Sequence, residues 1–193
     1  GIAIAHSTFN ILCTAMLLPA GGLLEKLAVR LVPDTTKAEQ TVELDERLLA
    51  APSMALQRSS AVAGEMAECA VRALKNSLTA FTAHTPELAQ SIRDDEAHCD
   101  HYEDILGTYL VRLSAQQMGA DESEEATALL KSIGDLERIS DHAVNVLSSA
   151  EELRSKGLSF SRDAVAEFNV LAAAINEILD LSLRCFTQRD VHI

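Results

Sequence analysis

Two pairs of acidic residues have a spacing that suits a metal ion. Glu96 and Asp100 form one Glu-x-x-x-Asp pair, and Glu137 and Asp141 form the other. Residues four apart lie on one face of an α-helix, about one turn from each other, so the two carboxylates of a pair can reach a common point. Carboxylate oxygens without soft donors favour iron, manganese, magnesium or zinc over copper.

The apolar residues around the pairs predict where the acids point. Leu88 and Ile92 lead to Glu96 in steps of four, and Ile133 leads to Glu137 in the same way. The acids occupy positions where leucine would continue the apolar stripe, so we expect all four carboxylates to face the interior of a helical bundle. Grouped carboxylates in such a place lose hydration and repel one another, and a cation relieves both penalties.

Other interpretations of these charges stay open. The pairs can be solvated charge beside the stripe, or can be neutralised by the nearby arginines Arg93, Arg112 and Arg138. His98 and His101, beside the first pair, can add nitrogen ligands or lie on a solvated face. Neither helix contains the Glu-x-x-His signature of ferritin-type di-iron proteins, which disfavours an oxygen-activating oxidase.

Four amphipathic helices are predicted to position these residues. Apolar residues recur at spacings of three and four, and with five Phe, two Tyr and no Trp the core must consist mainly of aliphatic residues, as in helical bundles. Thr85-Pro86 and Ser161 mark helix starts, and Gly119 and Gly157 mark helix ends. The predicted fold class is all-α, an antiparallel bundle, with helices over about residues 54–83, 85–118, 121–156 and 161 to the end.

The first 33 residues differ from the rest of the chain. Residues 2–18 are mostly apolar and just long enough for a membrane-spanning helix. His6 and Asn10 would share one face, which is tolerable against other transmembrane helices. A buried helix of a bundle is the other interpretation. Polar residues follow, so the predicted regions are 1–33, a linker over 34–53 and the helical bundle over 54–193.

The charge of the chain limits its partners. The formal net charge is −13, and residues 1–33 contribute only one of the 29 acidic and two of the 16 basic residues. A surface this acidic repels phosphate backbones, and no basic stripe reverses that, so nucleic acid is not expected as a partner. No nucleophile with a positioned base is evident, so no catalytic residue is assigned and an enzyme is not expected.

One stretch around the second acidic pair resembles a known family. Residues 135–146 (DLERISDHAVNV) closely resemble the PhoU signature, an L-E-R-I-G-D-H-A-x-N run that forms a metal-binding stretch, with Ser140 in place of glycine. Residues 96–100 (EAHCD) are similar to the other E/D-x-x-x-D motif of that family. The resemblance implies a PhoU-like three-helix repeat and a fourth helix that opens a second, truncated repeat. It also implies metal bound at Glu96, Asp100, Glu137 and Asp141.

The start of the chain resembles a second family. His6, Phe9 and Asn10 are similar to an A-H-x-x-F-N stretch in the last transmembrane helix of bacterial sodium-dependent phosphate cotransporters. Residues 44–56 (LDERLLAAPSMAL) resemble the joint between that transporter and its PhoU-like domain. Together the resemblances imply a cytoplasmic domain that modulates phosphate uptake, attached to a sodium:phosphate symporter at the cell inner membrane.

The resemblance also implies cofactors and partners. The cofactor is a divalent or trivalent metal: iron, manganese, zinc or magnesium. The partners are the membrane and the transporter core of the same protein, phosphate and sodium acting through that core, and a second copy in a homodimer. Two alternatives stay open, namely a soluble PhoU-like phosphate-signalling adaptor and a metal-dependent enzyme on a helical carboxylate bundle.

Overall fold

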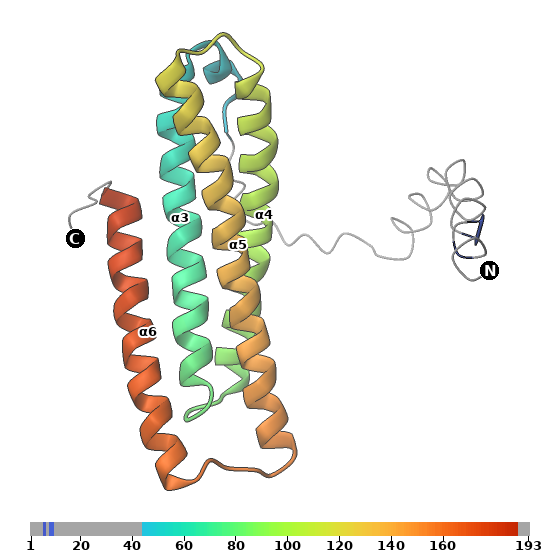
Figure 1. Cartoon of the computed structure of the whole chain (residues 1–193), viewed down its shortest axis with the longest axis vertical. Helices are drawn as coiled ribbons and strands as arrows, with labels where there is room; N and C mark the ends of the chain where they lie inside the picture. Colours follow the sequence, from blue (N-terminus) through green and yellow to red (C-terminus); the bar gives the residue numbers. More distant parts are fainter. Residues whose placement is uncertain (1–5, 7, 10–43, 189–193) are drawn as a thin grey trace. The chain divides into compact units, whose positions relative to one another are not determined.

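The computed structural model describes residues 6, 8, 9 and 44–188, and the described chain is all-α. A short 3₁₀ helix, η2 (Glu46–Ala50), precedes α3 (Pro52–Thr79), α4 (Pro86–Ser114), α5 (Ala120–Ser155) and α6 (Arg162–Gln188). The long helices run alternately up and down (Figure 1). The predicted all-α class and the four predicted helices are confirmed, and the ends that fall within the described residues agree to within about one turn. The predicted end of the fourth helix lies outside the described residues.

Local sequence signals explain where the helices begin and end. The hydroxyl oxygen of Thr85 accepts a hydrogen bond from the backbone N–H of Leu88 at 3.1 Å, and Pro86 occupies the first turn of α4. Ser161 caps α6 in the same way. Gly157 follows α5 with φ of 64°, a left-handed conformation that residues with a side chain rarely adopt.

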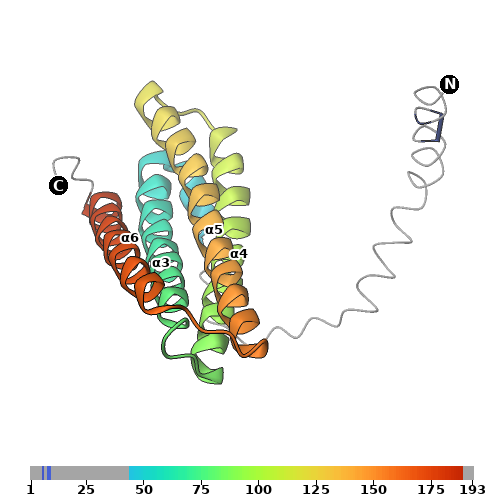
Figure 2. The ribbon, with the colours of Figure 1, turned by 60° about the horizontal axis from the view of Figure 1, so that its bottom comes forward.

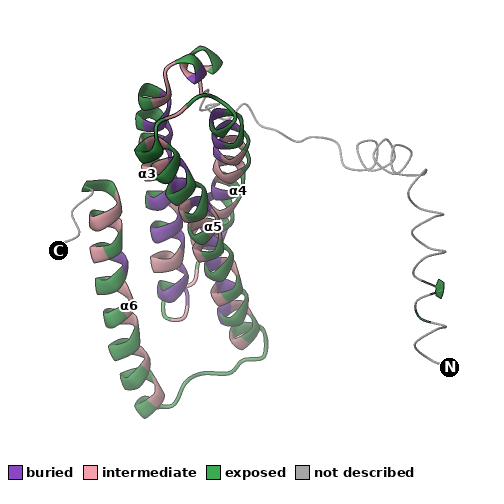
Figure 3. Cartoon of the chain, turned by 45° about the horizontal axis from the view of Figure 1, so that its top comes forward, coloured by how far each residue is buried: buried purple, intermediate pink, exposed green. Residues whose placement is uncertain are grey.

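The core lies between α3, α4 and α5, each of which packs against the other two. The buried faces of these helices turn toward one another (Figure 3). In contrast, α6 lies along α3 (Figure 2). Leu179 is the one buried residue among the described positions of α6, which leaves most of this helix in contact with solvent.

Two clusters of buried residues make up the core, and a break separates them along the bundle axis. The break falls between residues 70 and 73 on α3, between 92 and 99 on α4, and between 133 and 143 on α5. Arg72, Asp95 and Ser140 lie at this level. The polar level in the middle of the bundle is also where the predicted acidic pairs lie.

Part of the range predicted as a linker is ordered against the bundle. Helix η2 packs on α3 and α4, and Leu49 is buried. The hydroxyl group of Tyr109 donates a hydrogen bond to the carbonyl of Asp45 at 3.1 Å. These contacts hold residues 45–50 on the end of the bundle.

The predicted membrane segment falls mostly outside the described residues. His6 is helical and exposed, whereas Asn10 and nearly all of residues 1–33 are not described. Within the described residues, no helix combines the length and the apolar character that crossing a bilayer requires.

Candidate metal centre

Helices α4 and α5 bring three of the four predicted carboxylates together. One oxygen each from Glu96, Asp100 and Asp141 lies within 4.8 Å of the others. Glu96 and Asp100 are one turn apart on α4, and Asp141 faces them from α5. The two acidic motifs thus meet across one helix–helix interface, as their spacing predicted.

The prediction that these acids face the core was wrong. Glu96 is half-buried, and Asp100 and Asp141 are exposed, so the group lies at the surface edge of the interface. The buried stripe of α4 instead continues through Asp95 and Cys99. Two successive steps of four residues rotate a position by about 80° because one turn takes 3.6 residues. A buried stripe therefore alternates steps of three and four.

The three carboxylates oppose one another's ionisation. Partial burial, together with the charges of Asp100 and Asp141, raises the pKa of Glu96. Partial burial and the charges of Asp141 and Asp104 raise the pKa of Asp100. Loss of hydration and like charge act in the same direction, and a cation at their meeting point would counter both.

The arginines that might have neutralised this group bind elsewhere. Each pairs with a different carboxylate: Arg93 with Glu151, Arg112 with Glu46, and Arg138 with Asp135. Among the described residues, none forms an ion pair with Glu96, Asp100 or Asp141. Arginine pairing therefore does not account for the acidic group.

Glu137, the fourth predicted ligand, lies beside the group and not within it. Burial raises its pKa, and so do the negative charges of the neighbouring acids Asp141, Glu103 and Asp100. It does not join the set whose oxygens converge. His98 and His101 are half-buried on α4 and are likewise outside that set in the described structure.

The donor set fits a hard cation. Three carboxylates from two helices converge without a nitrogen or sulfur donor in the group. Iron, manganese and magnesium accept such oxygen ligands readily, whereas zinc sites usually include histidine or cysteine. Within this donor set, Glu96 and Asp100 would hold the ion from α4 and Asp141 from α5.

Sequence reasoning missed a buried ion pair next to this site. Asp95 is 5% exposed, and the guanidinium of Arg72 on α3 donates to both of its carboxylate oxygens, at 2.6 and 3.0 Å. A signal was present, because Asp95 stands three residues after the buried Ile92. The pair supplies the charge balance that a buried carboxylate requires.

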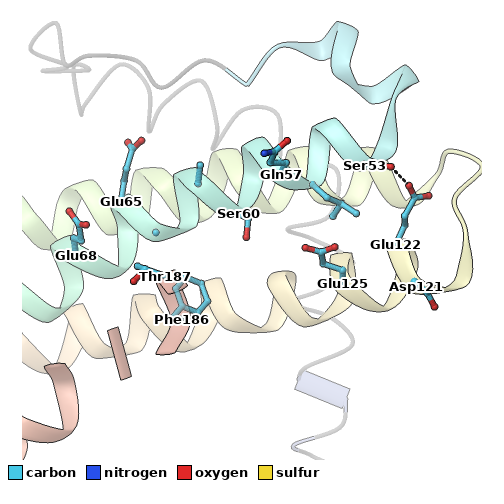
Figure 4. Close-up of a pocket in the computed structure, with 13 residues that line it drawn as sticks. Ser53, Gln57, Ser60, Glu65, Glu68, Asp121, Glu122, Glu125, Phe186 and Thr187 are labelled. Atoms are coloured by element: carbon cyan, nitrogen blue, oxygen red, sulfur yellow. Dashed lines mark hydrogen bonds between the residues drawn. The ribbon is translucent and has the colours of Figure 1, made fainter. Parts of the chain in front are cut away.

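A large hollow among the described residues is acidic, and the sequence did not predict it. It has a volume of about 790 Å³ and lies between α3, α5 and the end of α6 (Figure 4). All its charged residues are acids: Glu65, Glu68, Asp121, Glu122 and Glu125. These acids do not form a converging group of three in the described structure, so the hollow is not a second metal centre of this kind.

Comparison with known proteins matches part of the helical region to a family. No curated protein and no solved structure matches the chain. Residues 63–150 match the family model of the PhoU domain, a stretch that runs from within α3 to within α5 and includes both acidic motifs. PhoU domains are regulatory and not catalytic, in agreement with the expectation from the sequence, and they are known to bind metals. Residues 63–150 of this chain are a PhoU domain, as the stretch DLERISDHAVNV predicted.

Proposed function

We propose that this chain regulates phosphate uptake through its PhoU domain and that the Glu96–Asp100–Asp141 group binds a metal ion as part of that role. The observation that carries the proposal is the convergence of carboxylates from two separate motifs of the domain within 4.8 Å. The raised pKa values of Glu96 and Asp100 add support, because they describe charges that a cation would stabilise.

The position of the group suggests what an ion would do. The three acids connect α4 to α5 at the level where the two core clusters separate. The apolar packing is interrupted there, so a shared ion would add a link between the two helices at that level. An ion that binds only the folded chain also raises the free energy of unfolding. The domain would then be more rigid with metal than without it.

A phosphate-signalling adaptor is the form of regulator that these observations favour. The family match covers the helical domain alone, and the acidic site needs no residue outside that domain. Such an adaptor would act in the cytoplasm by contacting a transporter or its signalling partner, with phosphate uptake as the process it limits.

A domain attached to a sodium:phosphate symporter is the second candidate. It rests on the resemblance of His6, Phe9 and Asn10 to a transporter helix, which lies outside the matched residues. In this form the partners would be the membrane, the transporter core, sodium and phosphate, and residues 1–33 would anchor the chain at the inner membrane. A homodimer is compatible with either form.

Metal analysis of the purified chain tests the site. We expect bound iron or manganese in the wild type and its loss in Asp100→Asn/Asp141→Asn, because two of three ligands are gone. The matched control is Asp94→Asn/Asp135→Asn, which also neutralises one exposed acid on α4 and one on α5. Equal metal content in the two double variants would contradict the site.

Phosphate uptake by cells tests the regulatory role. Cells that express the wild type should differ in radiolabelled phosphate uptake from cells that express Asp100→Asn/Asp141→Asn at equal protein level. Membrane fractionation with and without residues 1–33 separates the two forms. If removal of these residues leaves the distribution unchanged, the symporter-attached form is wrong.

A further inference from the structure

A second hollow lies at the end of the bundle where α3 passes to α4 and α5 passes to α6. It has a volume of about 340 Å³. Its walls include Phe81, Leu158, Phe160 and Phe168, and we call it the aromatic pocket. An adjoining hollow of about 440 Å³ shares Phe81, Leu158 and Phe160 with it. This space is in the range of small-molecule sites, which are mostly apolar with a few polar groups.

Three phenylalanine rings from distant parts of the chain form the apolar wall. The centroid of Phe168 lies 5.0 Å from that of Phe81 and 5.9 Å from that of Phe160. The wall is open to a ligand, because Phe160 is 40% exposed and Leu158 is 58% exposed. Exposed apolar side chains grouped around a hollow are typical of a surface that binds something.

A cation stands beside this apolar wall. Arg154 lines the pocket, and its guanidinium donates to the carbonyl of His84 at 3.3 Å. Among the described residues, no carboxylate lies within 4.0 Å of the guanidinium of Arg154. Glu152, which lines the adjoining hollow, is paired with Lys156. Arg154 is therefore available to an anion in a chain with a net charge of −13.

We propose that the aromatic pocket binds a small amphipathic anion. The apolar or aromatic body of the ligand would lie against Phe81, Phe160 and Phe168, and its carboxylate or sulfonate group would pair with Arg154. Arginine suits this role because its planar donors match such groups in a charge-assisted hydrogen bond. A cationic ligand of the same size would lack this pairing and meet Arg154 as a like charge.

This site is independent of the metal centre. The pocket joins α5, through Arg154, to α6, through Phe168, and α6 otherwise packs along α3. A bound anion would thus hold the start of α6 to the end of α5. Arg154 and residues 158–168 lie outside the matched PhoU stretch, whereas Phe81 lies within it.

Binding of 8-anilinonaphthalene-1-sulfonate, an aromatic sulfonate, tests the proposal on the full chain. We expect saturable binding, with affinity about tenfold weaker in Arg154→Gln, since a hydrogen bond to a charged group is lost. Leu158→Ser should weaken binding as well. Decanoate should displace the probe, whereas decyltrimethylammonium, with the same chain length and the opposite charge, should not.

Two matched variants control for other surfaces of α6. Arg184→Gln removes an exposed cation on α6 outside the pocket, and Ile178→Ser removes an apolar side chain that is 61% exposed. Both should bind the probe like the wild type. The proposal is overturned if Arg154→Gln binds normally, or if Ile178→Ser loses as much binding as Leu158→Ser. Because Arg154 is exposed, Arg154→Gln should fold, and its affinity for the probe tests the proposal even if Leu158→Ser does not fold.

Discussion

Asp95 and Glu96 are neighbours on α4, and their carboxylates have opposite environments. Asp95 points into the bundle, where it is 5% exposed and bound by two nitrogens of Arg72. Glu96 points to the edge of the α4–α5 interface, where it meets Asp100 and Asp141 and no arginine. Among the residues that the structure describes, Asp95 thus has its countercharge beside it, whereas Glu96 has two like charges beside it.

This difference distinguishes an acid that stabilises the fold through an internal partner from an acid that can bind a cation from solution. A buried acid must be balanced inside the fold, so its partner is part of the folded structure. A half-exposed group of acids can carry negative charge without a cationic partner, because water screens the charge. The pKa values of such acids are raised. The unbalanced group is the one that can gain a cation from solution, and it is the one that the family motifs supply.

The largest expected effect comes from breaking the buried pair. Arg72→Ala leaves Asp95 buried without its partner and should lower the free energy of unfolding by about 2 kcal/mol. Urea unfolding measures this change. Arg58→Ala, an exposed position on the same helix, should change stability by less than about 0.5 kcal/mol. Equal losses in both variants would mean that the pair does not hold the fold.

Neutralising the open group should have the opposite sign. Without metal, Asp100→Asn/Asp141→Asn should be more stable than the wild type by about 0.5 kcal/mol, because like charges at the edge are removed. Thermal unfolding in the presence of a chelator measures the difference. Asp94→Asn/Asp135→Asn should show no such gain. With manganese added, the order should reverse, since only the wild type gains from the ion.

The pH dependence of stability should distinguish paired from unpaired acids. The hydrogen bond from Arg93 lowers the pKa of Glu151, so this acid stabilises the fold above its unfolded pKa, and the gain is lost as the pH falls through its folded pKa. The raised pKa of Glu96 works the other way. Its ionised form costs stability at neutral pH, and the cost disappears as the pH falls through the raised pKa.

The opposite contributions of Glu151 and Glu96 to stability can be measured with single variants. At neutral pH and without metal, Glu151→Gln should melt below the wild type and Glu96→Gln above it. In a series of thermal melts, the Glu96→Gln difference should shrink as the pH falls from 7 toward the ordinary glutamate pKa of 4.5, whereas the Glu151→Gln difference should persist down to that pH and shrink only below it. A difference of the same sign for both variants would refute the contrast between them.

The smallest effect is expected for Glu137, at the edge of the acidic group. Asp141→Asn should weaken manganese binding by more than about tenfold, because a ligand is lost. Glu137→Gln should weaken it far less, since Glu137 does not reach the point where the other three acids converge. Calorimetric titration with manganese compares the two. Equal losses would make Glu137 a fourth ligand, as the sequence predicted.

Helix ends and family motifs could be predicted because they depend on neighbours along the chain. Thr85, Pro86 and Ser161 begin helices where expected, since a cap acts within one turn. The PhoU stretch was identifiable for the same reason, as a run of adjacent residues. The site was predicted in part, and Glu96, Asp100 and Asp141 do converge.

Burial and pairing depended on the tertiary structure. Whether residue 95 or residue 96 faces the core depends on a rotation of 100° per residue, and a small error in the assumed stripe exchanges them. Arg72 and Asp95, and likewise Arg93 and Glu151, lie on different helices, so no local pattern pairs them. The aromatic pocket joins Phe81 to Phe160 and Phe168 in the same long-range way.

By itself, the sequence determined the helices, the acidic character and the two acidic motifs, because each depends on residues that are close along the chain. Only the tertiary structure decided that Asp95 pairs with an arginine and that Glu96 faces two other acids. Packing sets the rotation of each helix and brings Arg72, distant in sequence, to Asp95. Within the described part of the chain, it brings no arginine into an ion pair with the three converging acids. The candidate metal centre therefore depends on the helix packing as well as on the two acidic motifs.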